Sequence, residues 1–187
     1  MTDLSTLNIS DTEDLWVFAY GSLMWNPGFD FEERVPANVE GYHRSLCVLS
    51  TMYRGTPERP GLVLGLDVGG SCCGLAFRVA AKNVAKTVEY LDEREQVTKV
   101  YTSVLLPATL NDGREIQTYT FIVRREHEQF AGELSLEEQA HLVARGKGQA
   151  GRALEYLANT IEHITELGLH DPELHEVLNL AQADAPS

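Results

Sequence analysis

One acidic side chain stands out because it continues the apolar face of a predicted helix. Residues 81–94 carry apolar side chains at helical spacing, namely Val84, Val88 and Leu91. At about 100° per residue, Glu95 falls about 20° from Val84, whereas Asp92 and its other acidic neighbours fall off the stripe. A carboxylate on such a face has a partner, marks the helix end, or has a pKa raised by burial that suits proton transfer near neutral pH. Periodicity alone favours the plainer alternative, in which the helix stops at Arg94 and Glu95 is solvated.

A second feature with chemical potential is a strand that breaks into a glycine and a hydroxyl. Val17, Phe18 and Tyr20 are strand formers, and Gly21 and Ser22 follow directly. Glycine permits a ligand to approach the backbone closely. The amides after Gly21 could therefore serve as fixed donors to a carboxylate or a developing oxyanion. The pattern alone favours the alternative of an ordinary turn.

Other motifs that could bind a ligand or perform chemistry give weaker evidence of function. Residues 146–151 match Gly-x-Gly-x-x-Gly, but a helix is predicted before them, so we favour a connection between helices over a dinucleotide site. No nucleophile is activated, since Ser22 is outside a Gly-x-Ser-x-Gly elbow and the cysteines lack an assigned histidine partner. The three cysteines form no Cys-x-x-Cys pair and are expected to be small buried side chains: Cys47, Cys72 and Cys73. The six histidines show no ligand spacing, so no structural metal is expected.

Length and charge restrict the possible partners. The 187 residues suit one domain, and 15 Lys and Arg against 28 Asp and Glu give a net charge of −13. Nucleic acid and anionic membranes would repel such a chain. The first fifteen residues do not resemble a signal peptide, and no run of about eighteen apolar residues occurs. We expect a cytoplasmic protein that binds neither nucleic acid nor membranes, with no prediction of its oligomeric state.

The predicted elements give an α+β fold. Strand-like runs predict one hairpin across residues 67–71, a second across residues 111–113, and a mainly antiparallel sheet that curves or closes into a small barrel. A helix lies between the hairpins, and a helical segment follows, with helices at residues 136–145, 152–167 and 172–180. The predicted organisation is a flexible lead-in (1–14), one domain (15–180) and a tail (181–187).

Six motifs resemble one family. Tyr20-Gly21-Ser22-Leu23, followed by Trp25, is similar to the signature loop of the ChaC branch of the γ-glutamylcyclotransferase superfamily. The other five occur in the family's order: Gly41-Tyr42-His43-Arg44, Tyr53-Arg54-Gly55-Thr56, Pro60-Gly61-Leu62-Val63, Tyr90-Leu91 with Arg94-Glu95, and Leu154-Glu155-Tyr156-Leu157. A collinear series over most of the chain is specific, whereas one motif alone would mean little.

The resemblance implies a fold, a reaction and a site. It implies a lyase of glutathione catabolism in which the substrate's α-amine attacks its own γ-carbonyl, giving 5-oxoproline and cysteinylglycine without metal or cofactor. Glu95 matches the family's catalytic acid/base. The implied substrate-binding residues are Ala19, Tyr20, Gly21, Ser22, Leu23, Met24, Arg54, Tyr101 and Tyr156. By residue type alone, the last three are better explained as packing or surface side chains.

Two alternatives stay open for the function. Residues 46–50 lack the Phe-Trp-Gln-Gly character of some animal members, so other γ-glutamyl amines or amino acids are alternative substrates. A non-catalytic γ-glutamyl-binding or regulatory protein is an alternative of another class. The presence of Glu95 argues against it.

Overall fold

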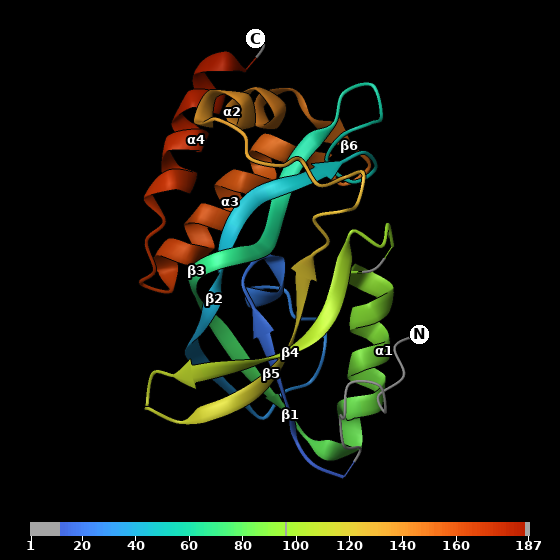
Figure 1. Cartoon of the computed structure of the whole chain (residues 1–187), viewed down its shortest axis with the longest axis vertical. Coiled ribbons are helices and arrows are strands. Elements are labelled where there is room, and N and C mark those ends of the chain that lie inside the picture. Colours follow the sequence, from blue (N-terminus) through green and yellow to red (C-terminus); the bar gives the residue numbers. More distant parts are fainter. Residues whose placement is uncertain (1–11, 96, 186–187) are drawn as a thin grey trace. The chain divides into compact units, whose positions relative to one another are not determined.

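The computed structural model describes residues 12–95 and 97–185, which form two compact units (Figure 1). The barrel unit comprises residues 12–44 and 66–124, and the helical unit comprises residues 45–65 and 125–185. Two long strands, β2 (Glu33–Ser50) and β3 (Gly61–Val79), contribute residues to both units. The expectation of one domain over residues 15–180 stays a prediction.

Five strands close into the predicted barrel, in the order β1-β3-β2-β4-β5. The remaining three strands are β1 (Leu15–Ala19), β4 (Tyr101–Leu110) and β5 (Glu115–Val123). All described pairings are antiparallel except that of β1 with β5, where Val17 lies opposite Tyr119. Alternating strand residues fill the barrel unit with a buried cluster that includes Phe18, Val39, Leu66, Ala76 and Leu110. The α+β prediction with an antiparallel barrel is confirmed.

One of the two predicted hairpins exists. The turn at residues 111–113 joins β4 to β5, and the Gly113 N–H donates to the Leu110 carbonyl at 2.9 Å. The other prediction is wrong, because β3 continues without reversal from Gly61 to Val79. Gly69 and Gly70 have φ values of 107° and 66° within the strand. Paired glycines suit a bulge as well as a turn, and the flanking apolar runs are the same in both cases.

The predicted helix between the strands continues through Glu95. A short 3-10 turn (η2, Ala81–Asn83) leads into α1 (Val84–Glu95), so the alternative in which the helix ends at Arg94 is wrong. Asp92 is also buried, which corrects the expectation that only Glu95 of the acidic cluster continues the buried face. The Tyr119 hydroxyl donates to Asp92 Oδ1 at 2.6 Å. This bond allows a carboxylate at the edge of the apolar stripe to be buried.

Tyr119→Phe is expected to lower the free energy of unfolding by about 1–3 kcal/mol, because the buried Asp92 carboxylate loses this hydrogen bond. Urea denaturation followed by circular dichroism measures the change. Tyr53→Phe removes the same hydroxyl from a side chain that is 43% exposed and should leave the unfolding midpoint unchanged. Equal unfolding midpoints for Tyr119→Phe and the unmodified protein would show that the Tyr119–Asp92 hydrogen bond does not stabilise the fold.

The helical unit contains the three predicted C-terminal helices. α2 (Leu136–Arg145) begins with the predicted capping box of Ser135 and Glu138. Next come the two-residue strands β6 (Lys147–Gly148) and β7 (Gly151–Arg152), then α3 (Ala153–Glu166) and α4 (Pro172–Asp184), whose N-cap is Asp171 as predicted. None of the described helices has the length and apolar character needed to cross a membrane.

The predicted end of the last helix and the predicted start of the tail need correction. α4 extends to Asp184, so the predicted tail begins too early at Ala181, which is buried. His141 Nδ1 lies 3.1 Å from Asp184 Oδ2 and Arg145 Nη2 lies 3.4 Å from Asp184 Oδ1, and these contacts hold Asp184 in the last turn. Residues 1–11 of the predicted lead-in and residues 186–187 of the tail lie outside the described residues. Asp14, the last residue of the predicted lead-in, forms an ion pair with Arg78, whose Nη1 lies 2.6 Å from Asp14 Oδ2.

Candidate active site

The glycine-bearing loop is short and held at both ends. After β1 ends at Ala19, residues 22–24 form a 3-10 turn (η1, Ser22–Met24) in which the Met24 N–H donates to the Gly21 carbonyl at 2.9 Å. Leu23 and Met24 are buried, so their side chains anchor the turn. Arg44 donates from Nε to the Tyr20 carbonyl at 2.6 Å. The loop therefore has a fixed backbone.

Glu95 is largely withdrawn from solvent at the end of α1. Its side chain is 22% exposed, and its Oε1 lies 3.2 Å from Arg94 Nε. Burial raises the pKa of the Glu95 carboxyl above its ordinary value of 4.5, and the positive charge of Arg94 partly opposes this effect. A carboxyl with an elevated pKa can both accept and return a proton near neutral pH.

One guanidinium connects Glu95 to the loop. Besides its contact with Glu95, Arg94 donates from Nη2 to Ser22 Oγ at 3.0 Å and from Nη1 to the Asn26 carbonyl at 2.7 Å. The barrel unit thus brings the predicted acid/base within one side chain of the predicted binding loop. Tyr101, a third predicted site residue of this unit, is the half-buried first residue of β4.

The helical unit brings together two other predicted site residues. The Arg54 guanidinium lies 5.4 Å from the centre of the Tyr156 ring, in cation–π geometry, and also donates to the Ala150 carbonyl. The Tyr156 hydroxyl accepts a long hydrogen bond from the Leu64 N–H at 3.5 Å. Both side chains are half-buried, and they are 102 positions apart in the sequence. Their roles in substrate binding stay predictions.

The Gly-x-Gly-x-x-Gly stretch connects α2 to α3, as predicted, and supports the Arg54 segment. The Gln149 and Ala150 amides donate to the carbonyls of Met52 and Tyr53 at 2.9 and 2.8 Å. A Cβ at Gly148 would lie 2.4 Å from the Met52 oxygen and 2.5 Å from the Tyr53 carbonyl carbon. The glycine is needed here for close contact between two backbone segments.

Gly148→Ala is expected to lower the free energy of unfolding by about 1–3 kcal/mol, because the new methyl group would force these segments apart. Thermal unfolding followed by circular dichroism measures the change. Gln149→Ala is the matched control, since it changes an exposed neighbouring side chain and keeps the backbone hydrogen bond. A variant as stable as the unmodified protein would show that the segments can separate without cost.

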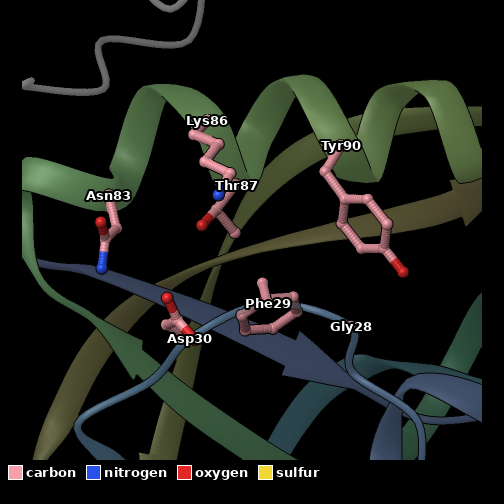
Figure 2. Close-up of a pocket in the computed structure, with 7 residues that line it drawn as sticks. All are labelled: Gly28, Phe29, Asp30, Asn83, Lys86, Thr87 and Tyr90. Atoms are coloured by element: carbon pink, nitrogen blue, oxygen red, sulfur yellow. The ribbon is translucent and has the colours of Figure 1, made fainter.

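A cavity of about 270 Å³ lies in the barrel unit beside α1 (Figure 2). Figure 2 shows its two walls, one from residues 28–30 and one from α1 and the turn before it. The lining residues are Gly28, Phe29, Asp30, Asn83, Lys86, Thr87 and Tyr90. None of these belongs to the predicted site, so the cavity does not identify the substrate pocket.

The sequence also supports predictions about the cysteines and the possible metal ligands. Cys47 and Cys72 are buried as expected, but Cys73 is exposed, which corrects the prediction for that residue. It lies on β3 next to buried Cys72, and neighbouring strand residues face opposite sides of a sheet. Among the residues that the structure describes, no three His, Cys, Asp or Glu side chains are placed to hold a metal ion.

The sequence model of the family described as "ChaC-like protein" matches residues 15–184. The chain belongs to the ChaC-like family. This confirms the resemblance inferred from the six motifs.

Relatives of this ChaC-like chain are similar over most of its length. The glutathione-specific gamma-glutamylcyclotransferase of Escherichia coli (strain K12) is 32% identical over 168 residues, which cover 90% of this chain and 73% of the relative. The protein of the same name from Schizosaccharomyces pombe is 30% identical over 188 residues, with 89% and 91% coverage. A crystal structure of a glutathione-specific gamma-glutamylcyclotransferase from yeast superposes with a TM-score of 0.84, at 22% identity and with 92% and 97% coverage. This last match confirms the γ-glutamylcyclotransferase-like fold.

The sequence patterns did not reveal the side chain that links Glu95 to the loop of this ChaC-like site, which is Arg94. Arg94 falls about 80° from the apolar stripe of α1, so periodicity gave it no role. Its contacts with Ser22 and Asn26 join positions about 70 residues apart, which no local pattern reveals. The available signal was its place beside Glu95 in the Arg-Glu motif.

Proposed function

We propose that this chain is a γ-glutamylcyclotransferase that cleaves glutathione into 5-oxoproline and cysteinylglycine. The observation that carries the proposal is the largely buried Glu95, joined through Arg94 to the glycine-bearing loop. Two relatives at 30% identity or more bear the name glutathione-specific gamma-glutamylcyclotransferase, which supports the choice of substrate.

The proposed reaction needs little from the protein because the substrate contains its own nucleophile. The α-amine of the γ-glutamyl group attacks the γ-carbonyl carbon, a C–N bond forms, and a five-membered ring closes. The bond from that carbon to the cysteine nitrogen then breaks, and no water is consumed. Correct orientation in such an intramolecular reaction can contribute roughly 7–11 kcal/mol.

Glu95 is proposed to move the proton. Its carboxylate accepts a proton from the substrate's α-ammonium, which makes the amine nucleophilic. The resulting carboxylic acid then donates this proton to the departing cysteine nitrogen. An elevated pKa favours both steps because the group must be ionised first and protonated afterwards.

The loop is proposed to stabilise the negative charge that develops on the γ-carbonyl oxygen. The Met24 N–H already donates to the Gly21 carbonyl, so we assign this role to the amides of Ser22 and Leu23. Arg54, Tyr101 and Tyr156 are proposed to bind the polar ends of the substrate, as the family resemblance implies.

A product assay tests the proposal and separates it from the alternative substrates. The purified protein is incubated with glutathione, γ-glutamyl-alanine and γ-glutamyl-lysine, and 5-oxoproline is quantified by mass spectrometry. Faster turnover of glutathione is expected. A preference for another substrate would keep the reaction and change the specificity, whereas no 5-oxoproline from any of them would favour a binding or regulatory role. The proposal includes a cytoplasmic location, which three free cysteines favour and which cell fractionation tests.

A further inference from the structure

Arg94 uses all three nitrogens of its guanidinium within the barrel unit. Nη2 donates to Ser22 Oγ at 3.0 Å, and Nη1 donates to the Asn26 carbonyl at 2.7 Å and to the Tyr90 hydroxyl at 2.9 Å. Nε faces Glu95 Oε1 at 3.2 Å. Only 22% of the Arg94 side chain is exposed. A single rigid group therefore sets the mutual positions of the loop, the helix and the carboxylate.

We propose that Arg94 is a positioning residue that holds residues 22–27 and the Glu95 carboxylate in one fixed arrangement. The inference rests on the proposed acid/base role of Glu95. Arg94 acts through the loop and Glu95, because each of its three guanidinium nitrogens has a partner among these protein groups. Catalytic geometry must be held to within about 0.5 Å, so a residue that fixes both partners controls the rate.

The neighbourhood of Arg94 supports this role. The chain just after residues 22–27 passes very close to α1. A Cβ at Gly28 would lie 2.0 Å from the Tyr90 hydroxyl oxygen, and Figure 2 shows Tyr90 pointing from the helix toward Gly28. That hydroxyl is also a partner of Arg94. At the other end of the loop, Arg44 holds the Tyr20 carbonyl. The loop is thus anchored by an arginine at each end.

A lysine could not replace Arg94. Its ammonium carries the same charge but presents its three donors from one atom, whereas the acceptors around Arg94 lie on several sides of a planar fork. A positioning role therefore requires the shape of the guanidinium. A role that depends on charge alone would be retained by Arg94→Lys.

Hydrogen exchange tests the anchoring without reference to activity. Amide exchange of residues 22–27 is compared by mass spectrometry in the unmodified protein, Arg94→Lys and Arg94→Met. Both variants are expected to exchange faster in this segment and at the normal rate in the β4–β5 hairpin. Arg114→Met is the matched control, because it removes ion pairs with Glu33 and Asp112 from the same unit. Unchanged exchange at residues 22–27 would overturn the inference.

Steady-state kinetics with glutathione tests the consequence for catalysis. Both Arg94 variants are expected to lose about 10- to 100-fold in kcat with a much smaller change in KM, since a misplacement of about 1 Å can cost that much. A normal kcat in either variant, Arg94→Lys or Arg94→Met, would overturn the inference. If the unmodified protein forms no 5-oxoproline while the exchange result holds, the proposed function fails and the anchoring stands. Arg94→Lys keeps the charge and the aliphatic stem, so it gives an answer even if Arg94→Met does not fold.

Discussion

Glu95→Gln is expected to lower kcat for 5-oxoproline formation by about 10²- to 10⁴-fold, the range typical of a lost general acid/base. The amide has nearly the same shape as the carboxylic acid but cannot accept the proton of the α-ammonium or return it to the leaving nitrogen. Glutathione binding should change far less than kcat, because the proposed binding groups are untouched. A variant with the turnover of the unmodified protein would exclude Glu95 as the acid/base.

The pH profile gives an independent measure of the same group. Glu95 must be ionised to accept a proton, so kcat/KM of the unmodified protein should fall as the pH drops through the Glu95 pKa. Because burial raises this pKa, the acid limb should lie above the ordinary value of 4.5. The residual activity of Glu95→Gln should lack this limb. An acid limb unaltered by the substitution would have to come from another group.

The stability of Glu95→Gln serves as the control for folding. A carboxyl whose pKa is raised in the folded state stabilises the fold only while it is protonated, and this contribution is lost as the pH rises through that pKa. The ionised form of Glu95 is therefore destabilising to the fold, and glutamine removes that charge. Urea denaturation at pH 7 should give an unfolding midpoint no lower than that of the unmodified protein. A much lower midpoint would show that lost activity reflects lost structure.

Glutathione acetylated at its α-amine is expected to release no cysteinylglycine. Acetylation converts the attacking amine into an amide, whose nitrogen is a poor nucleophile, so the ring cannot close. Mass spectrometry of the reaction mixture detects the dipeptide, and unmodified glutathione added to the same sample shows that the protein stays active. Release of cysteinylglycine from the acetylated compound would require water or a side chain as the nucleophile, and the proposed mechanism would be wrong.

Much of the fold could be predicted because local sequence patterns determine many of its elements. The β4–β5 hairpin follows from Asp112-Gly113 between strand formers, and α2 follows from the capping box at Ser135. The error at Gly69 and Gly70 has a physical reason. Both a bulge and a turn use positive φ, and only pairing with neighbouring strands decides between them.

The candidate site was only partly visible in the sequence. Periodicity put Glu95 on the apolar stripe of α1 but favoured a solvated helix end, and only the family resemblance gave it a catalytic role. Its link to Ser22 depends on Arg94, whose partners come from a distant loop. Asp92 was missed because its burial depends on Tyr119, 27 positions further on. Such contacts arise when the barrel closes, and no local period encodes them.

Incubation with glutathione in ¹⁸O-labelled water tests the internal-nucleophile reaction most directly. Mass spectrometry of the products should give 5-oxoproline without label and an equal amount of cysteinylglycine, because the attacking atom is the substrate's own nitrogen. Glutamate carrying ¹⁸O, formed by attack of water on the γ-carbonyl, would contradict the proposed reaction.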